Sequence, residues 1–341
     1  MLENQMKRIL VLLLLLSVSI SFAQTKVGTT AANFLAIPVG PRASGMGGAF
    51  VATANDATAL YWNVGGISRM TENELGVSYS QWLLGTNYNW IGLVYKVDEN
   101  NTVGFSINQL DYGQEDVTTV DYPNGTGEKW SAQDLAIAVS YGRNLTDRFS
   151  IGGSVKYIHQ QIYRESASAF ALDVGLLFNT QLDGLRIGMN IANFGSEMKL
   201  DGQDLIYGLD IDHKSGSGNN EYISSALTMD SWTLPLLFTV GLAYDAVKTS
   251  DIRVTVASDA VYPNNTNSFI NVGGEACYDD LFFVRVGYNS LFKQEAIERL
   301  CAGVGFKYDF GAVKTKIDYS YQDFKDGLFT PISKVSLTIG F

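Results

Sequence analysis

The chain has 341 residues, a formal net charge of −11 at pH 7, and only 17% charged residues. This acidity excludes broad electrostatic attraction to nucleic acid phosphates, so we expect no nucleic acid partner. Glycine (34), tyrosine (18) and phenylalanine (18) are plentiful, whereas proline (6) and cysteine (2) are scarce. This composition favours many strands and few helices.

The first 23 residues have the three parts of a secretory signal peptide. Lys7 and Arg8 precede an apolar run over residues 9–20, and Ala23 ends a short small-residue site. A transmembrane helix is the alternative, but the run is short for a span of about 20 residues. We expect cleavage after Ala23, and no later apolar run is long enough for a spanning helix. The mature chain is therefore expected either to be soluble after export or to cross a membrane as strands.

Residues 24–71 form a lead-in (24–38) followed by a glycine-rich stretch over residues 39–69. Small residues are too frequent there for an ordinary helix, and the pattern is too irregular for a strand. The stretch therefore predicts a tight fold inside something larger. Its notable positions are Gly45, Gly47, Gly48, Asn55, Asp56, Tyr61, Trp62 and Asn63.

Residues 72–341 alternate between apolar and polar side chains, which places one set on each face of a strand. In residues 313–321, one face is Val, Thr, Ile, Tyr and Tyr, and the other has Lys314, Lys316, Asp318 and Ser320. We predict about fourteen strands, near residues 74–82, 86–97, 101–111, 132–144, 149–163, 167–181, 185–193, 233–246, 251–261, 268–278, 281–289, 300–309, 312–322 and 331–341.

The polar faces distinguish a membrane barrel from a soluble sandwich. They are mostly Gly, Ala, Ser and Thr with few charges, whereas the open face of a soluble sandwich is densely charged. Every second connection is short, as on the periplasmic side of outer-membrane barrels, and this rule places both chain ends in the periplasm. The last strand ends in Phe341, which resembles the C-terminal signal read by the outer-membrane barrel assembly machinery. The sequence thus predicts an all-β, up-and-down, antiparallel outer-membrane β-barrel, with a secreted all-β protein as the alternative.

Catalytic and metal-binding motifs are missing from the sequence, so we expect no enzyme, no metal and no cofactor. The segment 45–50 approaches a dinucleotide fingerprint, but Phe50 occupies its sixth position and no strand-then-helix frame surrounds it. The histidines, His159 near a strand's outer end and His213 in a long loop, are interpreted as surface residues. His159 alone keeps a barrel hydrolase open as an alternative. Cys277 and Cys301 are expected to be free thiols.

Eight charged residues are predicted to face the lumen. They could form a substrate path, but we favour pairing with one another and with an inserted plug, because charges facing a narrow interior need partners. These residues are Asp173, Arg186, Arg253, Arg285, Lys307, Lys314, Lys316 and Asp318. The long loop over residues 194–232 contains an apolar stretch at 205–211 that offers a partner surface, with simple disorder as the alternative.

Three short segments (45–52, 55–59 and 61–63) resemble the PorV/PorQ family of Bacteroidetes outer-membrane proteins, within the wider group of FadL-like transporters. The family usually continues Asn63 with Pro-Ala-Gly, whereas this chain has Val64, Gly65 and Gly66. The resemblance implies a barrel whose lumen holds an N-terminal hatch formed by residues 24–71.

Two functions follow from this resemblance. The first is non-enzymatic binding of the translocon and of cargo proteins in type IX secretion and surface attachment. The second is FadL-like uptake of hydrophobic small molecules across the outer membrane, for which Gly152–Gly153 and Gly273–Gly274 are the best candidates for a strand kink.

Overall fold

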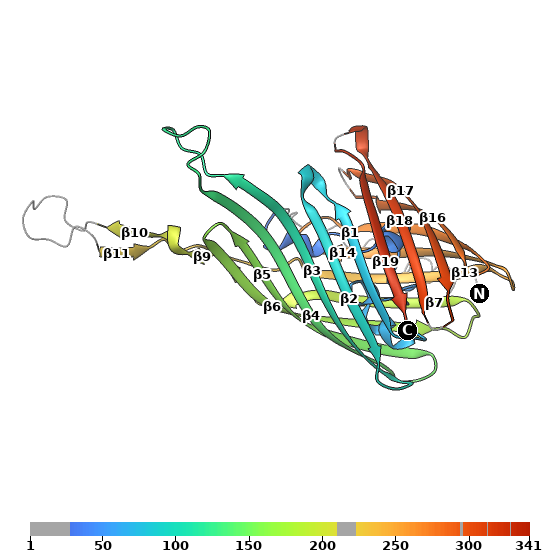
Figure 1. The fold of residues 1–341 in the computed structure, drawn as a ribbon. Helices are drawn as coiled ribbons and strands as arrows, with labels where there is room; N and C mark the ends of the chain where they lie inside the picture. Colours follow the sequence, from blue (N-terminus) through green and yellow to red (C-terminus); the bar gives the residue numbers. More distant parts are fainter. Residues whose placement is uncertain (1–27, 210–222, 294–295, 312, 328) are drawn as a thin grey trace, which may run out of the picture.

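The computed structural model describes residues 28–209, 223–293, 296–311, 313–327 and 329–341, and its long strands close into one barrel (Figure 1). The predicted signal peptide, residues 1–23, lies outside the described residues. The barrel strands are β1 (Glu74–Gln81), β2 (Asn87–Lys96), β3 (Asn101–Asp116), β4 (Lys129–Asn144), β5 (Phe149–Ile162), β6 (Glu165–Asn179), β7 (Leu185–Gly195), β13 (Leu237–Lys248), β14 (Ile252–Pro263), β15 (Phe269–Tyr278), β16 (Phe282–Leu291), β17 (Glu298–Asp309), β18 (Lys314–Phe324) and β19 (Ile332–Gly340).

Each barrel strand pairs antiparallel with both of its neighbours, so the sheet has no free edge. β1 pairs with β2 and with β19, and β7 pairs with β6 and with β13 across the long outer connection. Asn73 and Phe341 exchange two backbone hydrogen bonds beside the β1–β19 pair. The prediction of a fourteen-stranded antiparallel barrel is confirmed, with seven strands before the long connection and seven after it.

The largest error in the predicted boundaries concerns the β3–β4 hairpin. Strand β3 continues to Asp116 and strand β4 begins at Lys129, so the outer connection between them is shorter than the predicted span of residues 112–131. The pairing continues after a register shift between Asp111 and Gln114. Outside the membrane both faces of the hairpin contact water. Its side chains therefore do not alternate between apolar and polar, and the sequence pattern does not predict the paired strands there.

Short elements occur in the long outer connection, in the N-terminal segment and in the β1–β2 and β18–β19 connections. Within the described residues, no helix is both long enough and apolar enough to cross a membrane. The short strands are β8 (Met198–Lys199), β9 (Asp201–Gly202), β10 (Ile206–Leu209), β11 (Ile223–Ala226) and β12 (Ser231–Trp232). The helices are α2 (Pro41–Gly45), α3 (Ala59–Trp62) and the 3₁₀ helices η1 (Asn33–Ala36), η2 (Val64–Arg69), η3 (Leu83–Gly85), η4 (Gln203–Leu205) and η5 (Lys325–Gly327).

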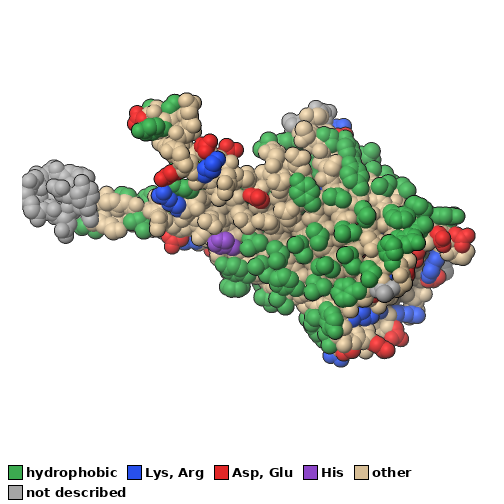
Figure 2. All heavy atoms as spheres, in the orientation of Figure 1, with side chains coloured by type: hydrophobic (Ala, Val, Ile, Leu, Met, Phe, Trp, Pro, Cys, Tyr) green, Lys and Arg blue, Asp and Glu red, His purple; other side chains and the backbone are tan. Residues whose placement is uncertain are grey.

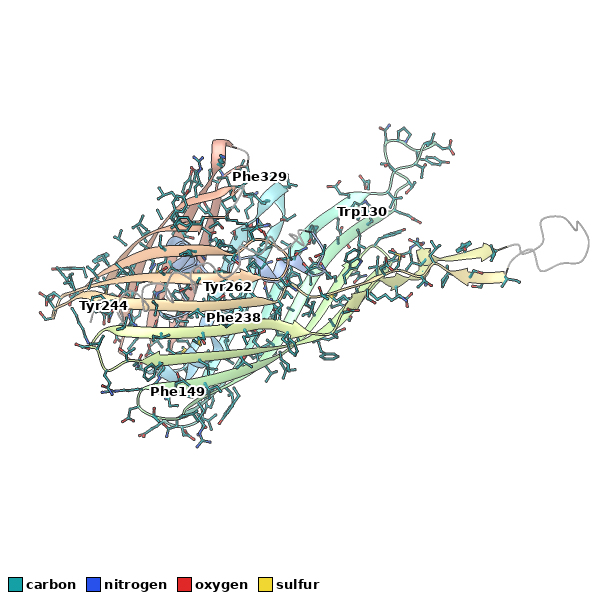
Figure 3. The ribbon with its side chains drawn as sticks, turned by 180° about the vertical axis from the view of Figure 1, so that it is seen from behind. Trp130, Phe149, Phe238, Tyr244, Tyr262 and Phe329 are labelled. Carbon is teal, nitrogen blue, oxygen red and sulfur yellow. The ribbon has the colours of Figure 1, made fainter. Side chains whose placement is uncertain are left out.

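The outer wall of the barrel is apolar. Figure 2 shows hydrophobic side chains spread over the wall, while most charged side chains in that view gather towards its two ends. Aromatic side chains occur near both ends: Figure 3 places Phe149 and Tyr244 towards one end and Trp130 towards the other. An apolar band between aromatic girdles is the arrangement that lipid requires of a transmembrane barrel.

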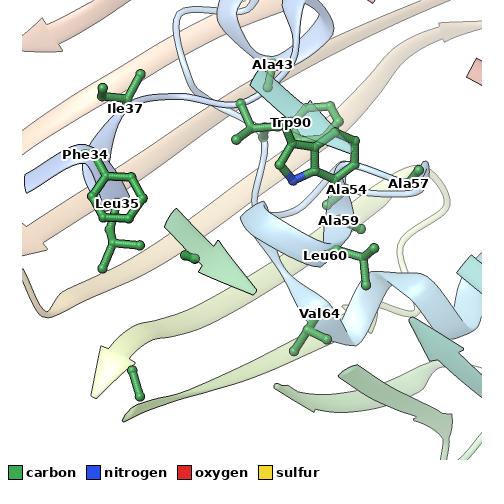
Figure 4. Close-up of a cluster of buried hydrophobic side chains, with 14 of the residues drawn as sticks. Phe34, Leu35, Ile37, Ala43, Ala54, Ala57, Ala59, Leu60, Val64 and Trp90 are labelled. Atoms are coloured by element: carbon green, nitrogen blue, oxygen red, sulfur yellow. The ribbon is translucent and has the colours of Figure 1, made fainter. Parts of the chain in front are cut away.

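Residues 30–72 lie inside the barrel, shown in blue in Figure 1. Their apolar side chains, such as Phe34, Leu60 and Val64, form a buried cluster with lumen-facing residues of the wall, such as Trp90 (Figure 4). Burial of this cluster, together with contacts between η2 and strands β4, β5 and β6, fixes the segment in the lumen.

The lead-in corrects the expected topology, in which both chain ends lay in the periplasm. Thr30 forms a parallel bridge with Thr233 at the outer end, and the Ala32 N–H donates to Gln160. Asn265, in the outer β14–β15 connection, donates to Thr30 and Asn33. The described chain therefore begins at the outer end of the lumen and descends to the periplasmic end, where Lys314 binds Glu72. Connection lengths could not reveal this, because they report only on the strands.

One glycine of each pair proposed as a kink packs against the N-terminal segment. The strand register passes through Gly152–Gly153 and through Gly273–Gly274 without a shift. A Cβ at Gly152 would collide with the Val64 carbonyl, and one at Gly273 with the Met46 carbonyl. These glycines let the backbone of the N-terminal segment approach the wall closely.

Gly47 combines a close approach with a left-handed backbone. Its φ is +64°, and a Cβ there would lie 2.6 Å from the backbone nitrogen of Tyr288. Gly85, in the outer β1–β2 connection, has a φ of +79° but open space around it. Comparing the two positions separates backbone strain from steric exclusion.

We expect Gly47→Ala to lower the free energy of unfolding by more than Gly85→Ala does. Both substitutions incur the cost of a left-handed alanine, about 1–2 kcal/mol, but only the first forces the N-terminal segment away from β16. Urea unfolding of the barrel in phospholipid vesicles measures both variants. Equal losses would show that the segment is not tightly packed at Gly47.

A charge on the lipid-facing wall tests the membrane position of the strands. We expect Val304→Arg, in the middle of β17, to destabilise the barrel by about 2–4 kcal/mol. The control Val97→Arg lies in a periplasmic connection and should cost about 0–1 kcal/mol. Both valines are similarly exposed, at 53% and 58%, so equal costs in the same vesicle assay would contradict the lipid-facing assignment.

Candidate functional site

One cavity of the lumen, here called the outer cavity, lies between the N-terminal segment and the outer half of strands β7 and β13–β16. Its volume is about 190 Å³. The lead-in contributes Leu35, Ala36 and Pro38, and α3 contributes Tyr61 and Trp62. The wall contributes Lys156, Asn190, Asn193, Leu237, Thr239, Val261, Phe269, Asn271 and Asn289, among others.

Tyr61 and Trp62 connect the floor of this cavity to the lead-in. The Tyr61 hydroxyl donates to the Leu35 carbonyl at 3.0 Å, and the Trp62 indole N–H donates to the Val39 carbonyl at 2.9 Å. Their rings meet edge to face, with centroids 5.2 Å apart. Each side chain thus packs its apolar body while its polar atom is satisfied.

Asn63 is completely buried and joins three parts of the lumen. Its amide nitrogen donates to the carbonyls of Val51 at 2.8 Å and Leu176 at 2.9 Å. Its side-chain oxygen accepts from the Gly65 N–H at 3.1 Å and caps η2. The cap forms although Val64 stands where the PorV/PorQ family usually has proline.

Asn55 and Asp56 are held by Arg42 of α2. The Arg42 guanidinium donates to Asn55 Oδ1 at 2.7 Å and to Asp56 Oδ2 at 2.8 Å. The other Asp56 oxygen accepts from the Thr58 N–H, which closes the local turn. Burial by itself raises the pKa of the Asp56 carboxyl, but the charges of Arg42 and Lys316 outweigh it and hold that pKa below its usual range.

A buried ion network joins the N-terminal segment to the wall. Arg285 is only 1% exposed and binds Glu275 at 2.6 Å and Asp318 at 2.7 Å. Arg42 contacts the same Glu275 carboxylate at 3.0 Å, and Lys316 lies 3.4 Å from Asp318. Removing one member would leave a buried charge without compensation, which is strongly destabilising.

Four of the five remaining predicted lumen charges form separate pairs. These are Asp173 with Lys156 at 2.6 Å, Arg186 with Asp245 at 2.6 Å, Arg253 with Asp280 at 3.4 Å, and Lys314 with Glu72 at 2.6 Å. Lys307 lines a second cavity of about 200 Å³ at the periplasmic end and makes no ion pair with a described residue. Seven of the eight charges are thus paired, which favours the pairing interpretation over a charged substrate path.

Sequence reasoning missed Asp259, which is buried completely in β14. One of its carboxylate oxygens accepts the backbone N–H groups of Phe50 at 2.8 Å and Val51 at 2.9 Å. The alternation of side chains in β14 predicts that Asp259 faces the lumen. It does not predict the hydrogen-bond partners of Asp259, because residues 24–71 have no periodic pattern from which their alignment with the wall could be inferred.

Sequence reasoning also missed an irregular position in the wall beside the outer cavity. The β6–β7 register shifts between Leu172 and Val174, and Asn193 has a left-handed φ of 64°. Its N–H donates to Asp173, and its amide nitrogen donates to the Pro235 carbonyl at 3.0 Å. Asparagine tolerates this backbone better than most residues, but one asparagine in a strand is too weak a signal for prediction.

The other predicted residues have simple surroundings. His159 lies 2.9 Å from the Ser168 hydroxyl and stacks beside Tyr157. His213 lies outside the described residues. Cys277 and Cys301 are buried thiols that form no disulfide with another described residue, as predicted. In the described part of the chain, no group of three or more His, Cys, Asp or Glu side chains is arranged to hold a metal.

Known structures with a similar fold are FadL-like barrels. The CymD monoaromatic hydrocarbon channel is 14% identical, with a TM-score of 0.54 over 89% of this chain and 97% of its own. A Pseudomonas aeruginosa FadL homologue is 12% identical, with a TM-score of 0.51 over 93% and 98%. The Pseudomonas putida toluene transporter TodX is 12% identical, with a TM-score of 0.53 over 87% and 96%. At these identities the likeness shows the fold alone.

No curated protein matches the chain. The family model described as "Type IX secretion system protein PorV" matches residues 20–218, which is more than half of the chain. Together with the closed barrel and its apolar wall, this match confirms the resemblance found in the hatch residues and the location in the outer membrane. The chain belongs to the PorV family of outer-membrane barrels.

Proposed function

We propose that this barrel binds partner or cargo proteins in type IX secretion and surface attachment, without catalysing a reaction. The family match supports this function, and an apolar surface on the outer side gives it a physical basis. We call the outer arm the described parts of residues 203–232, built around β10 and β11. Figure 1 shows β10 and β11 projecting well away from the barrel.

The outer arm exposes an unusual number of large apolar side chains to water. They are Ile206, Tyr207, Leu209, Ile223, Leu227, Met229 and Trp232, each at least 36% exposed. The β10–β11 pair forms a sheet of its own, and an isolated two-stranded sheet is marginally stable in water. A protein partner covering this surface would bury the apolar groups and stabilise the sheet.

We expect the double variant Ile206→Ser and Leu209→Ser to reduce co-purification of translocon or cargo proteins by about tenfold, because loss of two apolar anchors costs more than 1.4 kcal/mol. The measurement is affinity purification of the tagged barrel from outer membranes. The control Val120→Ser and Tyr122→Ser alters two exposed residues of the other large outer loop and should have no effect.

Deletion of the whole protein provides a second arm of this test. Cargo bearing a type IX C-terminal signal should accumulate in the periplasm. Normal surface delivery in a strain without paralogues would contradict the proposal, as would equal recovery of partners with both double variants.

Uptake of small hydrophobic molecules is the second candidate function. It is favoured by the outer cavity and by the irregular wall at Asn193, which lines that cavity. The titles of the structural neighbours describe a monoaromatic hydrocarbon channel and a toluene transporter. Since the N-terminal segment separates the outer cavity from the periplasmic one, uptake through the lumen requires that segment to act as a hatch and move.

A reversible crosslink tests this movement. In a background with both native cysteines replaced by serine, Ser68→Cys with Asn144→Cys links η2 to β4, at side chains now hydrogen-bonded at 2.9 Å. We expect toluene uptake into vesicles to stop on oxidation and to return on reduction.

The control pair, Ser140→Cys with Ser154→Cys, links two wall strands at hydroxyls 2.7 Å apart and leaves the N-terminal segment free. Uptake that continues through the oxidised Ser68–Asn144 variant would exclude hatch movement. Equal inhibition by both crosslinks would assign the effect to the wall.

A further inference from the structure

The outer cavity is lined by two kinds of side chain. Leu35, Trp62, Leu237 and Phe269 are apolar, whereas Asn190 on β7 and Asn271 on β15 carry amides. An entirely apolar ligand would leave these amides without hydrogen bonds.

The two asparagines have unused hydrogen-bonding groups, although they are only 5% and 4% exposed. The Asn271 oxygen accepts from the Ser290 N–H at 3.0 Å. Its amide nitrogen, and the whole side-chain amide of Asn190, make no hydrogen bond to another described residue. Buried polar groups are normally satisfied, so each unpaired group in such a place calls for a water molecule or a ligand.

The buried cation of the cavity already has a carboxylate partner. The ammonium group of Lys156 is neutralised by Asp173 at 2.6 Å and donates to Asn193 at 2.9 Å. Lys293 also lines the cavity and lies 5.2 Å from the centroid of the Phe269 ring. Because the charge of the buried Lys156 is compensated, the interior favours a neutral ligand over a carboxylate.

The volume sets the size of that ligand. The cavity measures about 190 Å³, and an apolar protein cavity of about 150 Å³ accommodates benzene. A single ring with one small polar substituent fits this space, whereas a long acyl chain exceeds it.

We propose that the outer cavity binds a small uncharged amphipathic molecule. Its apolar ring or short chain contacts Leu35, Trp62 and Phe269, and its amide or hydroxyl head exchanges hydrogen bonds with Asn190 and Asn271. The role of this site in uptake rests on the second proposed function. Binding itself does not, because a ligand can bind whether or not the N-terminal segment moves.

Three ring compounds of similar size test the proposal: benzamide, toluene and benzoate. Calorimetric titration of the full-length barrel in detergent should give benzamide an affinity about tenfold above that of toluene and of benzoate. Asn190→Leu should weaken benzamide about tenfold and leave toluene unchanged or tighter. The difference between the two proteins in the same detergent removes the contribution of partitioning into micelles.

The control is Asn108→Leu, which alters another buried, lumen-facing asparagine that does not line this cavity. It should leave all three affinities unchanged. Toluene binding as tightly as benzamide would overturn the polar-head assignment, tighter benzoate would show charge recognition instead, and no saturable binding of any probe would exclude the site. Binding without vesicle uptake would retain this inference while removing the transport function.

Discussion

The structure depends on close contact between two backbones, that of the N-terminal segment and that of the barrel wall. Small residues at Gly47, Gly152 and Gly273 let these backbones meet, where any larger residue would hold them apart. At that distance water is excluded, so each polar group of the segment must find a partner on the wall. The Asp259 carboxylate and the Arg42–Glu275–Arg285–Asp318 network supply such partners.

This arrangement explains why the lumen is divided rather than open. The outer cavity has apolar and amide side chains, and the periplasmic cavity is lined by charged residues. Between them, the hydrogen bonds of Asn63 and the buried ion network tie the segment to several strands at once. Any passage through the lumen would have to break these contacts together, which makes the segment a cooperative barrier.

The outer surface has a different physical character. Lipid covers the apolar wall, whereas the apolar side chains of the outer arm are exposed to water. A partner surface would relieve that exposure. Protein binding on the outer arm and ligand binding in the cavity are therefore compatible, since they use separate parts of the molecule.

The sequence by itself determined the barrel, because lipid on one side and a lumen on the other impose a strict two-residue period that alternation reveals. It also located the family residues Gly45–Asn63, since their small and aromatic side chains suit a tightly packed segment. Only the tertiary structure decided where that segment runs, and it corrected the expected periplasmic start: the lead-in bridges Thr233 at the outer end. The partners of Arg285 and Asp259, the packing role of Gly152 and Gly273 and the irregularity at Asn193 likewise appeared only there. The reason is physical: an aperiodic segment pairs with strands far away in sequence, and no local pattern records which residues will meet.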